Sequence, residues 1–508
     1  MTNDYMTATD GPDTRDGFFR QAYNVSYNGR VEEPSPETFL ESSDTPIESD
    51  LLPDDEDEEE TKNAYQPKKD SKTYEYDVAI IGSGPAGRAA AVRAQSLGGK
   101  VILFERDSLG GKWLNSGCIP AKVFLNRKPD NAGFENAYSD KNAFVSKLAS
   151  SLARRMRTLR VRVEVGEAVL KSPHEVLCRG KIYKASSVIL CGGAKPVVPQ
   201  LPGLSHPGVI TMDKIFELSE MPPRLLIYGG GTEGCEIASA FASFGCKVMI
   251  IETGSQLLPG WDSEIAESVE KMLMDKGVKV HTGVGVKEIV DRNGDPFVVT
   301  ERGGVLCDKV LLATSQKPDL SVLDTLTTDI EVDDGLPVVN EYMETSIPGI
   351  YAAGDITGLG FQTHAACSMA ETAASNAMGQ QRVLELWSVP MVISLKPEAA
   401  SVGLSEEETR ERYGDEFVVG YITLIDNIKA MLDDASEGFV KVIAGKKHGE
   451  IYGVHIIGPN ASEMIEGPAA LMRMEATIHE VVDDIIHAHP TYAEAFTEAC
   501  AEALKGLQ

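Results

Sequence analysis

Residues 76–87 read Tyr-Asp-Val-Ala-Ile-Ile-Gly-Ser-Gly-Pro-Ala-Gly, and this stretch decides the fold. The apolar run predicts a buried strand, and Gly82, Gly84 and Gly87 follow it in the G-x-G-x-x-G spacing. A helix-like segment, RAAAVRAQSLG, comes next, and KVILFE predicts a second strand that ends at Glu105. Together they form the βαβ unit of dinucleotide binding, in which Gly82 allows a tight turn, Gly84 admits the pyrophosphate and Gly87 permits close helix packing.

The same unit occurs a second time. Gly229, Gly231 and Gly234 follow the strand-like RLLIY, and KVMIIE ends at Glu252. Each glutamate stands 23 residues after the first glycine of its motif, where an acid accepts a ribose hydroxyl. Two units indicate two bound dinucleotides, usually a flavin and a nicotinamide. Glu252 favours a free 2′-hydroxyl, so NADH is expected in preference to NADPH.

Composition limits the remaining classes. The 508 residues predict about three domains. A net charge of −29 argues against nucleic acid and anionic lipid as partners, and no apolar run is long enough for a spanning helix, so we expect a cytoplasmic protein. The eight cysteines show no paired metal spacing, so reduced thiols and no metal site are expected.

Residues 1–72 differ from the rest of the chain. They hold 7 basic and 19 acidic side chains, which accounts for −12 of the net −29, and they include the seven-acid run at residues 54–60. Without periodic apolar positions such a segment cannot bury enough surface to fold, so a disordered acidic tail is predicted. The alternative is a docking arm, with Phe18, Phe19 and Tyr23 as contacts.

Residues 110–122, GGKWLNSGCIPAK, resemble the redox-active segment of the pyridine nucleotide-disulfide oxidoreductases, which include dihydrolipoamide dehydrogenase and mercuric reductase. The resemblance continues through Cys191-Gly-Gly, through the GIYAAGD that ends at Asp355, and through HAHPTYAE at residues 487–494. It covers about residues 73–508 in the order of the family.

The resemblance implies an α/β fold with two Rossmann-like domains and a C-terminal α+β dimerisation domain. The FAD-binding domain would comprise residues 73–196 and 311–384, the NAD-binding domain residues 197–310, and the interface domain residues 385–508. A homodimer is implied, because the partner subunit completes each active site in this family.

The resemblance also implies roles for single residues. Gly110, Gly111 and Asp355 would contact FAD, and Lys122 would lie near the flavin, paired with Glu236. The sequence supports that pair, because a lysine beside an apolar turn and a glutamate in an apolar helix are each unfavourable to bury alone.

Disulfide-reducing relatives carry two cysteines five positions apart in this segment. Here the first position is Trp113 and only Cys118 remains, so no internal disulfide can form at the site. Beside a flavin and Lys122, Cys118 is expected to have a lowered pKa and to serve as a charge-transfer or sulfenic thiol; the alternative is an inert, packed residue.

His489 and Glu494 match the acid/base pair of the family, which reaches in from the other subunit. A local interpretation is also available, because Thr491 can cap a helix with Glu494 at its third position, as in a capping box. Both interpretations can hold together.

Three departures from the family pattern surround the expected flavin. Glu233 replaces an apolar residue near the nicotinamide, Lys112 replaces a small residue beside Trp113, and Gln316 stands where relatives carry arginine. Because local departures gather at functional sites, the clustered changes at Lys112, Trp113 and Glu233 indicate a changed substrate. Glu233 adds negative charge where NADH is expected to bind.

Three functional hypotheses follow. The first is an FAD enzyme that oxidises NADH and reduces a non-disulfide acceptor, either a small molecule such as a quinone or a protein. The second is dihydrolipoyl dehydrogenase-like thiol chemistry with Cys118 alone. The third is a non-catalytic flavoprotein scaffold that docks through its acidic tail.

Overall fold

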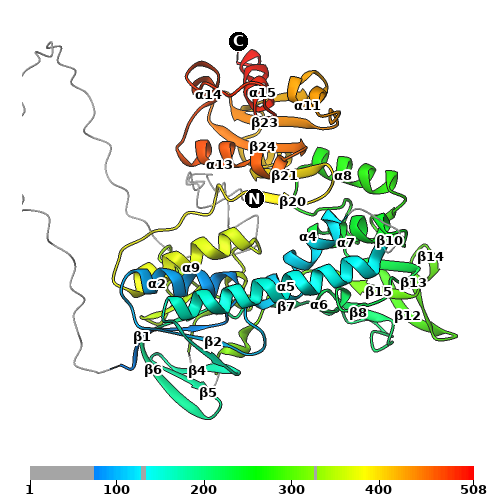
Figure 1. Cartoon of the computed structure of the whole chain (residues 1–508). Helices are drawn as coiled ribbons and strands as arrows, with labels where there is room; N and C mark the ends of the chain where they lie inside the picture. The colour runs from blue at the N-terminus through cyan, green and yellow to red at the C-terminus, as the bar shows by residue number, and fades with distance from the viewer. Residues whose placement is uncertain (1–73, 128–132, 325–328, 508) are drawn as a thin grey trace, which may run out of the picture.

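The computed structural model describes residues 74–127, 133–324 and 329–507. The chain builds three main sheets with helices packed against them, as Figure 1 shows. The predicted acidic tail, residues 1–72, lies outside the described residues. No helix in the described ranges combines the length and the apolar character that crossing a membrane requires.

The first sheet has seven strands in the order β3-β2-β1-β6-β5-β4, with β19 also paired to β6. Its parallel part contains β1 (Tyr76–Ile81), β2 (Val101–Glu105), β3 (Arg162–Val165), β6 (Lys181–Leu190) and β19 (Ile350–Ala352). The antiparallel part adds β4 (Ala168–Ser172) and β5 (Glu175–Cys178). Helices α2 (Pro85–Ser96) and α9 (Thr363–Ala377) bury their alanine-rich faces against the parallel strands.

The second sheet is wholly parallel, in the order β11-β10-β9-β15-β8. Its strands are β8 (Val209–Thr211), β9 (Arg224–Tyr228), β10 (Lys247–Ile251), β11 (Lys279–His281) and β15 (Lys309–Leu312). Helices α6 (Met212–Ile215), α7 (Thr232–Ser243) and α8 (Ser263–Asp275) pack on it, and β12 (Val286–Arg292), β13 (Asp295–Thr300) and β14 (Gly303–Leu306) form a separate antiparallel sheet.

The chain passes between the first two sheets through β7 (Ala194–Pro196) and β16 (Gln316–Pro318), which pair with each other. The expected domain boundary between residues 310 and 311 falls inside β15, which belongs to the second sheet. The apolar run at residues 310–313 fits either sheet by pattern alone, and its parallel pairing with β9 places it in the second. A division after Leu312 therefore keeps that sheet whole.

The C-terminal sheet is antiparallel, in the order β20-β21-β24-β23-β22. Its strands are β20 (Met391–Ile393), β21 (Glu398–Gly403), β22 (Phe417–Thr423), β23 (Phe439–Gly445) and β24 (Ile451–Gly458). Its helices are α10 (Glu406–Tyr413), α11 (Ile428–Leu432), α12 (Ala461–Met464), α13 (Glu466–Arg473), α14 (Ile478–Asp483) and α15 (Glu494–Lys505). The predicted fold class, two Rossmann-like units and a C-terminal α+β unit, is confirmed.

A buried ion cluster joins the second and third units. Lys441 on β23 is 1% exposed, and its Nζ lies 3.1 Å from Asp262, 3.1 Å from Glu264 and 2.9 Å from Glu406. The three carboxylates raise the pKa of Lys441 despite its burial, and His455 and Lys441 hold the pKa of Asp262 below its ordinary value against the same burial effect.

Replacing Lys441 by methionine should lower the free energy of unfolding by about 3–5 kcal/mol, because three carboxylates lose their shared cation. Urea denaturation followed by circular dichroism measures this. Lys429→Met is the matched control, since the ion pair between Lys429 and Asp433 is exposed and its loss should change the free energy of unfolding far less. Equal losses in both variants would contradict a coupling role for Lys441.

Candidate dinucleotide and redox site

One continuous cavity of about 1580 Å³ extends from the first glycine loop to the second. It exceeds the roughly 300–1,000 Å³ typical of a single small-molecule pocket. Predicted site residues that line it are Gly82, Gly84, Glu105, Gly111, Cys118, Lys122, Gly229, Gly231, Glu236, Glu252 and Asp355. Gly87, Gly110, Gly234, His489 and Glu494 do not line it.

In the first glycine loop, two glycines leave no room for a side chain and the third faces open space. Gly82 has φ +106°, and a Cβ there would lie 2.1 Å from the carbonyl oxygen of Cys191. A Cβ on Gly87 would lie 1.8 Å from the carbonyl oxygen of Gly82, so α2 could not approach β1. Gly84, in contrast, has no atom within 4 Å of its built Cβ and faces open cavity at the start of α2.

Glu105, at the end of β2, is fixed by the loop that it faces. Its Oε2 accepts from the backbone N–H of Ser83 at 3.2 Å and from the Ser83 hydroxyl at 2.5 Å, and its Oε1 accepts from the N–H of Asp107 at 2.9 Å. Ser83 Oγ also accepts from the N–H of Gly110 at 3.0 Å, so this serine links the glycine loop to the segment of Gly110 and Gly111.

The second glycine loop repeats this geometry. A Cβ on Gly229 would lie 2.1 Å from the carbonyl oxygen of Ala313, one on Gly234 would lie 2.2 Å from that of Gly229, and Gly231 again faces open space. Glu252 accepts from the N–H groups of Gly230 at 2.6 Å and Gly254 at 2.7 Å.

These residues fit two dinucleotides. Each loop offers an open position at a helix start, which suits a pyrophosphate, and a carboxylate held by backbone N–H groups at the end of the next strand. Each carboxylate oxygen keeps lone-pair capacity for a ribose hydroxyl. The first loop and Asp355 would hold FAD, and the second loop with Glu252 would hold NAD(H).

Lys122 and Glu236 meet between the two loops. Lys122, on α4 (Cys118–Asn126), places its Nζ 2.6 and 2.8 Å from the carboxylate oxygens of Glu236 on α7. The N–H of Ser394, from the C-terminal unit, also donates to Glu236 at 2.9 Å. All three units of the fold therefore converge on this carboxylate.

Lys122→Met should lower the free energy of unfolding by about 1–3 kcal/mol, because it leaves the Glu236 carboxylate, 6% exposed, with a single donor. Thermal and urea unfolding of the purified protein measure the change. Lys214→Met removes a lysine whose partner Glu217 is largely exposed, and it should change the free energy of unfolding far less. An unchanged free energy of unfolding in Lys122→Met would show that the pair does not stabilise the fold.

Cys118 begins α4 and is open to the cavity. The expected lowering of its pKa is wrong for this structure: burial raises the pKa of the Cys118 thiol, and Lys122 opposes this only in part. The physical reason is the pairing just described, because Glu236 neutralises the lysine charge and Glu233 adds a further negative one. All eight cysteines lie in the described residues and are free thiols.

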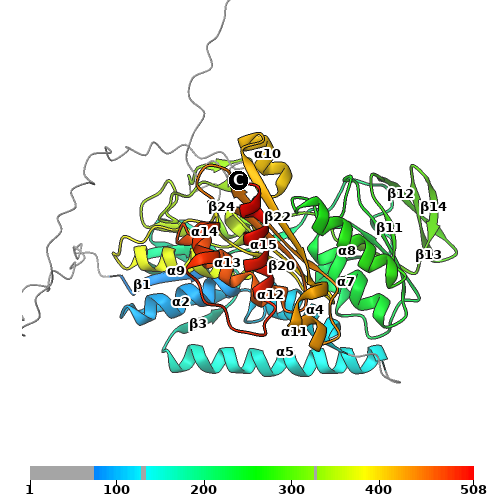
Figure 2. The same cartoon turned by 90° about the horizontal axis from the view of Figure 1, so that it is seen from above.

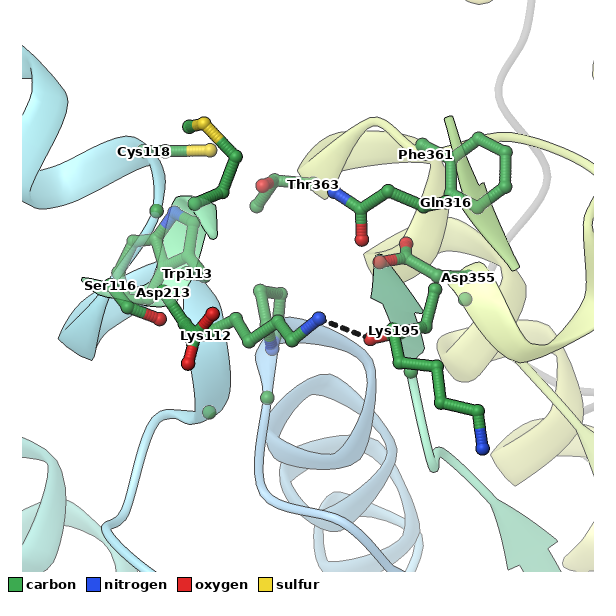
Figure 3. Close-up of a pocket in the computed structure, with 18 of the residues that line it drawn as sticks. Lys112, Trp113, Ser116, Cys118, Lys195, Asp213, Gln316, Asp355, Phe361 and Thr363 are labelled. Atoms are coloured by element: carbon green, nitrogen blue, oxygen red, sulfur yellow. Dashed lines mark hydrogen bonds between the residues drawn. The ribbon is translucent and has the colours of Figure 1, made fainter. Parts of the chain in front are cut away.

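Trp113, on α3 (Gly111–Asn115), lines the cavity beside Cys118 (Figure 3). The guanidinium carbon of Arg88 lies 4.7 Å from the centroid of its ring, within cation–π range. Arg88 Nε is buried and has no hydrogen-bond partner among the described residues. Arg88 was not predicted from the sequence; the available signal was a cation in the first turn of a helix, where the dipole disfavours positive charge.

Lys112 and Asp355 enter the cavity from opposite sides (Figure 3). Lys112 Nζ donates a hydrogen bond to the carbonyl oxygen of Ala194, and burial lowers its pKa. For the acid Asp355, burial has the opposite effect and raises the pKa to about 6, and the Lys112 charge acts against the rise. A backbone hydrogen bond also acts against the rise, and burial outweighs both effects.

Glu233 and Gln316 form a pair that the sequence did not join, although both were noted as departures. Gln316 Nε2 donates to both oxygens of Glu233 at 3.2 Å. Burial raises the pKa of Glu233, so this carboxyl lines the cavity at the second glycine loop with a reduced tendency to ionise.

His489 and Glu494 contact each other away from the cavity of their own chain. His489 Nδ1 lies 2.9 Å from Glu494 Oε1, and the N–H of Thr491 donates to Glu494 Oε2 at 2.8 Å. The expected capping box is only half formed, because Thr491 Oγ1 donates to the carbonyl of Ala488 instead and the helix begins at Glu494. The backbone donor and His489 lower the pKa of Glu494.

Comparisons with known proteins match this geometry. Residues 76–380 match the pyridine nucleotide-disulphide oxidoreductase family, and residues 389–500 match its dimerisation domain. Dihydrolipoyl dehydrogenase of Bacillus subtilis is 35% identical over 83% of this chain and 97% of its own. Glutathione reductase of Burkholderia cepacia is 32% identical over 83% and 98%. The copper(II) complex of RclA, an HOCl-induced flavoprotein disulfide reductase of Escherichia coli, aligns over 84% of this chain and 99% of its own with 28% identity and a TM-score of 0.78.

Proposed function

Since the chain belongs to the pyridine nucleotide-disulphide oxidoreductase family, we propose that it oxidises NADH and reduces an acceptor that is not a disulfide. Enzymes of this family bind FAD and use NAD(P)H, and the matched dimerisation domain supports a homodimer. The observation that carries the proposal is Trp113, which stands five residues before Cys118, at the position where disulfide-reducing relatives carry the first of their two cysteines.

A dithiol enzyme needs one thiolate to attack the substrate and a second to resolve the mixed disulfide. Cys118 alone cannot do both. The acceptor class that remains takes two electrons directly; for a quinone the balance is NADH, one proton and quinone giving NAD⁺ and quinol.

Each group of residues has a proposed task. The first glycine loop, Gly110, Gly111, Glu105 and Asp355 hold FAD, which when bound accepts two electrons from NADH and passes them on. The second loop and Glu252 hold NADH through its ribose and pyrophosphate. Lys122 and Glu236 fix the spacing of the two loops, because their ion pair joins α4 to α7.

The His489–Glu494 pair favours a second candidate, thiol chemistry that uses Cys118 with an external thiol. In this candidate Glu494 orients the His489 imidazole, and the pair of one protomer handles a proton at the cavity of the other. Lipoamide turnover by wild type and by Cys118→Ser tests it: activity that is equal in both, or absent from both, excludes the single-thiol route.

Anaerobic titration with NADH, followed by the flavin absorbance, tests the main proposal. One NADH per flavin should complete the bleaching, because no protein disulfide is present to take a second pair of electrons. Cys118→Ser should give the same endpoint, and an added quinone should restore the oxidised spectrum. An unchanged flavin spectrum would overturn the proposal, and uptake of a second equivalent that Cys118→Ser abolishes would assign the electrons to a thiol route.

A further inference from the structure

The end of α5 (Gly133–Thr158) and the start of β3 carry five arginines within nine residues, at positions 154, 155, 157, 160 and 162. Four of them, Arg154, Arg155, Arg157 and Arg160, are exposed and form what we call the arginine surface. This is a strongly positive feature on a chain whose net charge is −29. It lies on the flank of the first sheet, distant in sequence from both glycine loops.

The arginine surface has no anionic partner in the described part of the chain. Within residues 74–127, 133–324 and 329–507, none of its four guanidinium groups forms an ion pair with a carboxylate. The neighbouring Arg162 differs, because it lies 3.1 Å from Glu164. The four arginines therefore repel one another without compensation, and the helix C-terminal dipole offsets only part of that repulsion.

The arginine surface lies where the described chain begins. Arg162 Nη1 donates to the Tyr76 hydroxyl at 3.0 Å, and Tyr76 is the first residue of β1. Figures 1 and 2 both show the C-terminal end of α5 on the side of β1 and β3. The described chain therefore begins at the same edge of the first sheet as the end of α5.

We propose that the acidic run at residues 54–60 of the same chain docks on the arginine surface. Charge complementarity supports this occupant, since the run holds seven consecutive acidic residues and the arginine surface holds four guanidinium groups without a carboxylate partner in the described residues. The reach is sufficient, because the 14 residues from Glu60 to Tyr74 span up to about 50 Å when extended. Because the acidic run is covalently connected to the body, its effective concentration at the arginine surface is in about the millimolar range. Ion pairs that are individually weak can therefore form together.

Arginine suits this role better than lysine. Its planar guanidinium binds carboxylates through two parallel hydrogen bonds, and it retains its charge at any physiological pH. Each exposed pair contributes under about 1 kcal/mol and is screened by salt, so docking should be reversible and dependent on ionic strength. The proposal is independent of the electron acceptor.

Carbodiimide cross-linking of the full-length protein tests the proposal. An Arg157→Lys, Arg160→Lys double variant keeps the charge and supplies amines that the reagent can join to carboxylates. Mass spectrometry should find amide bonds between these positions and residues 54–60. Their yield should fall by about fivefold or more at 1 M salt, where the screening length is about 3 Å.

Two controls decide the outcome. Lys447, exposed on the C-terminal unit, should link to the acidic run at a much lower yield; equal yields would overturn the proposal. A mixture of isotope-labelled and unlabelled chains separates cross-links within one chain from those between chains, and links found only between chains would overturn the choice of occupant.

A second measurement does not depend on cross-linking. Replacing the seven acids by asparagine and glutamine should accelerate amide hydrogen exchange in residues 150–160 at low salt, and flavin content should be unchanged. The same exchange rate in wild type and in this variant would also overturn the proposal.

Discussion

Gly84→Val is expected to yield a folded protein that purifies without flavin. A Cβ at this position meets nothing within 4 Å, and the φ of −60° suits any L-residue, so the chain itself tolerates the side chain. The valine methyl groups would occupy the space that lets a pyrophosphate approach the start of α2. The affinity for FAD should fall by about 100-fold, equivalent to about 2.7 kcal/mol. The ratio of flavin to protein absorbance in the purified variant measures the resulting loss of bound flavin.

Gly87→Val is the informative contrast. Its Cβ would lie 1.8 Å from the carbonyl oxygen of Gly82, so α2 must move away from β1 and the fold itself should fail. Gly285→Ala, outside the left-handed region and with no atom within 4 Å of a built Cβ, controls for a glycine substitution as such. If Gly84→Val retains flavin at wild-type occupancy, the first glycine loop does not hold FAD.

The sequence predicted those parts of the site that are local in the chain. Each glycine loop and its glutamate lie within one βαβ unit, so spacing alone predicted that Glu105 and Glu252 would face their loops. The contact between Lys122 and Glu236 needed more, because 114 residues separate them. It was expected only because the family resemblance placed both near the flavin and because each is unfavourable to bury alone.

The contacts that were missed depend on packing between distant segments. Glu233 and Gln316 are 83 residues apart, and Lys441 and Asp262 are 179 apart, so no periodicity in the sequence connects them. The direction of the Cys118 pKa was misjudged for a related reason. The sequence showed the nearby lysine, whereas the desolvation of the thiol by the cavity walls and the neutralising Glu236 are properties of the folded chain.

Gly231→Val should separate the two dinucleotide sites. Like Gly84, Gly231 begins a helix with an ordinary φ, here −70°, and has open space around a built Cβ. The variant should therefore keep its fold and its flavin, while the KM for NADH rises by about 100-fold because the pyrophosphate can no longer approach α7. Stopped-flow reduction of the flavin by NADH measures the loss, and dithionite should still reduce the flavin fully.

The two valine variants give opposite results only if the loops bind different dinucleotides. Loss of flavin from Gly231→Val would mean that the second loop contributes to the FAD site or to the fold, contrary to the assignment. Normal NADH kinetics in Gly231→Val would instead remove the second loop from nicotinamide binding. In that case the carboxyl of Glu233, which lines the cavity at the second loop, would explain why NADH is excluded there. Glu233→Ile should then restore NADH binding at the second loop.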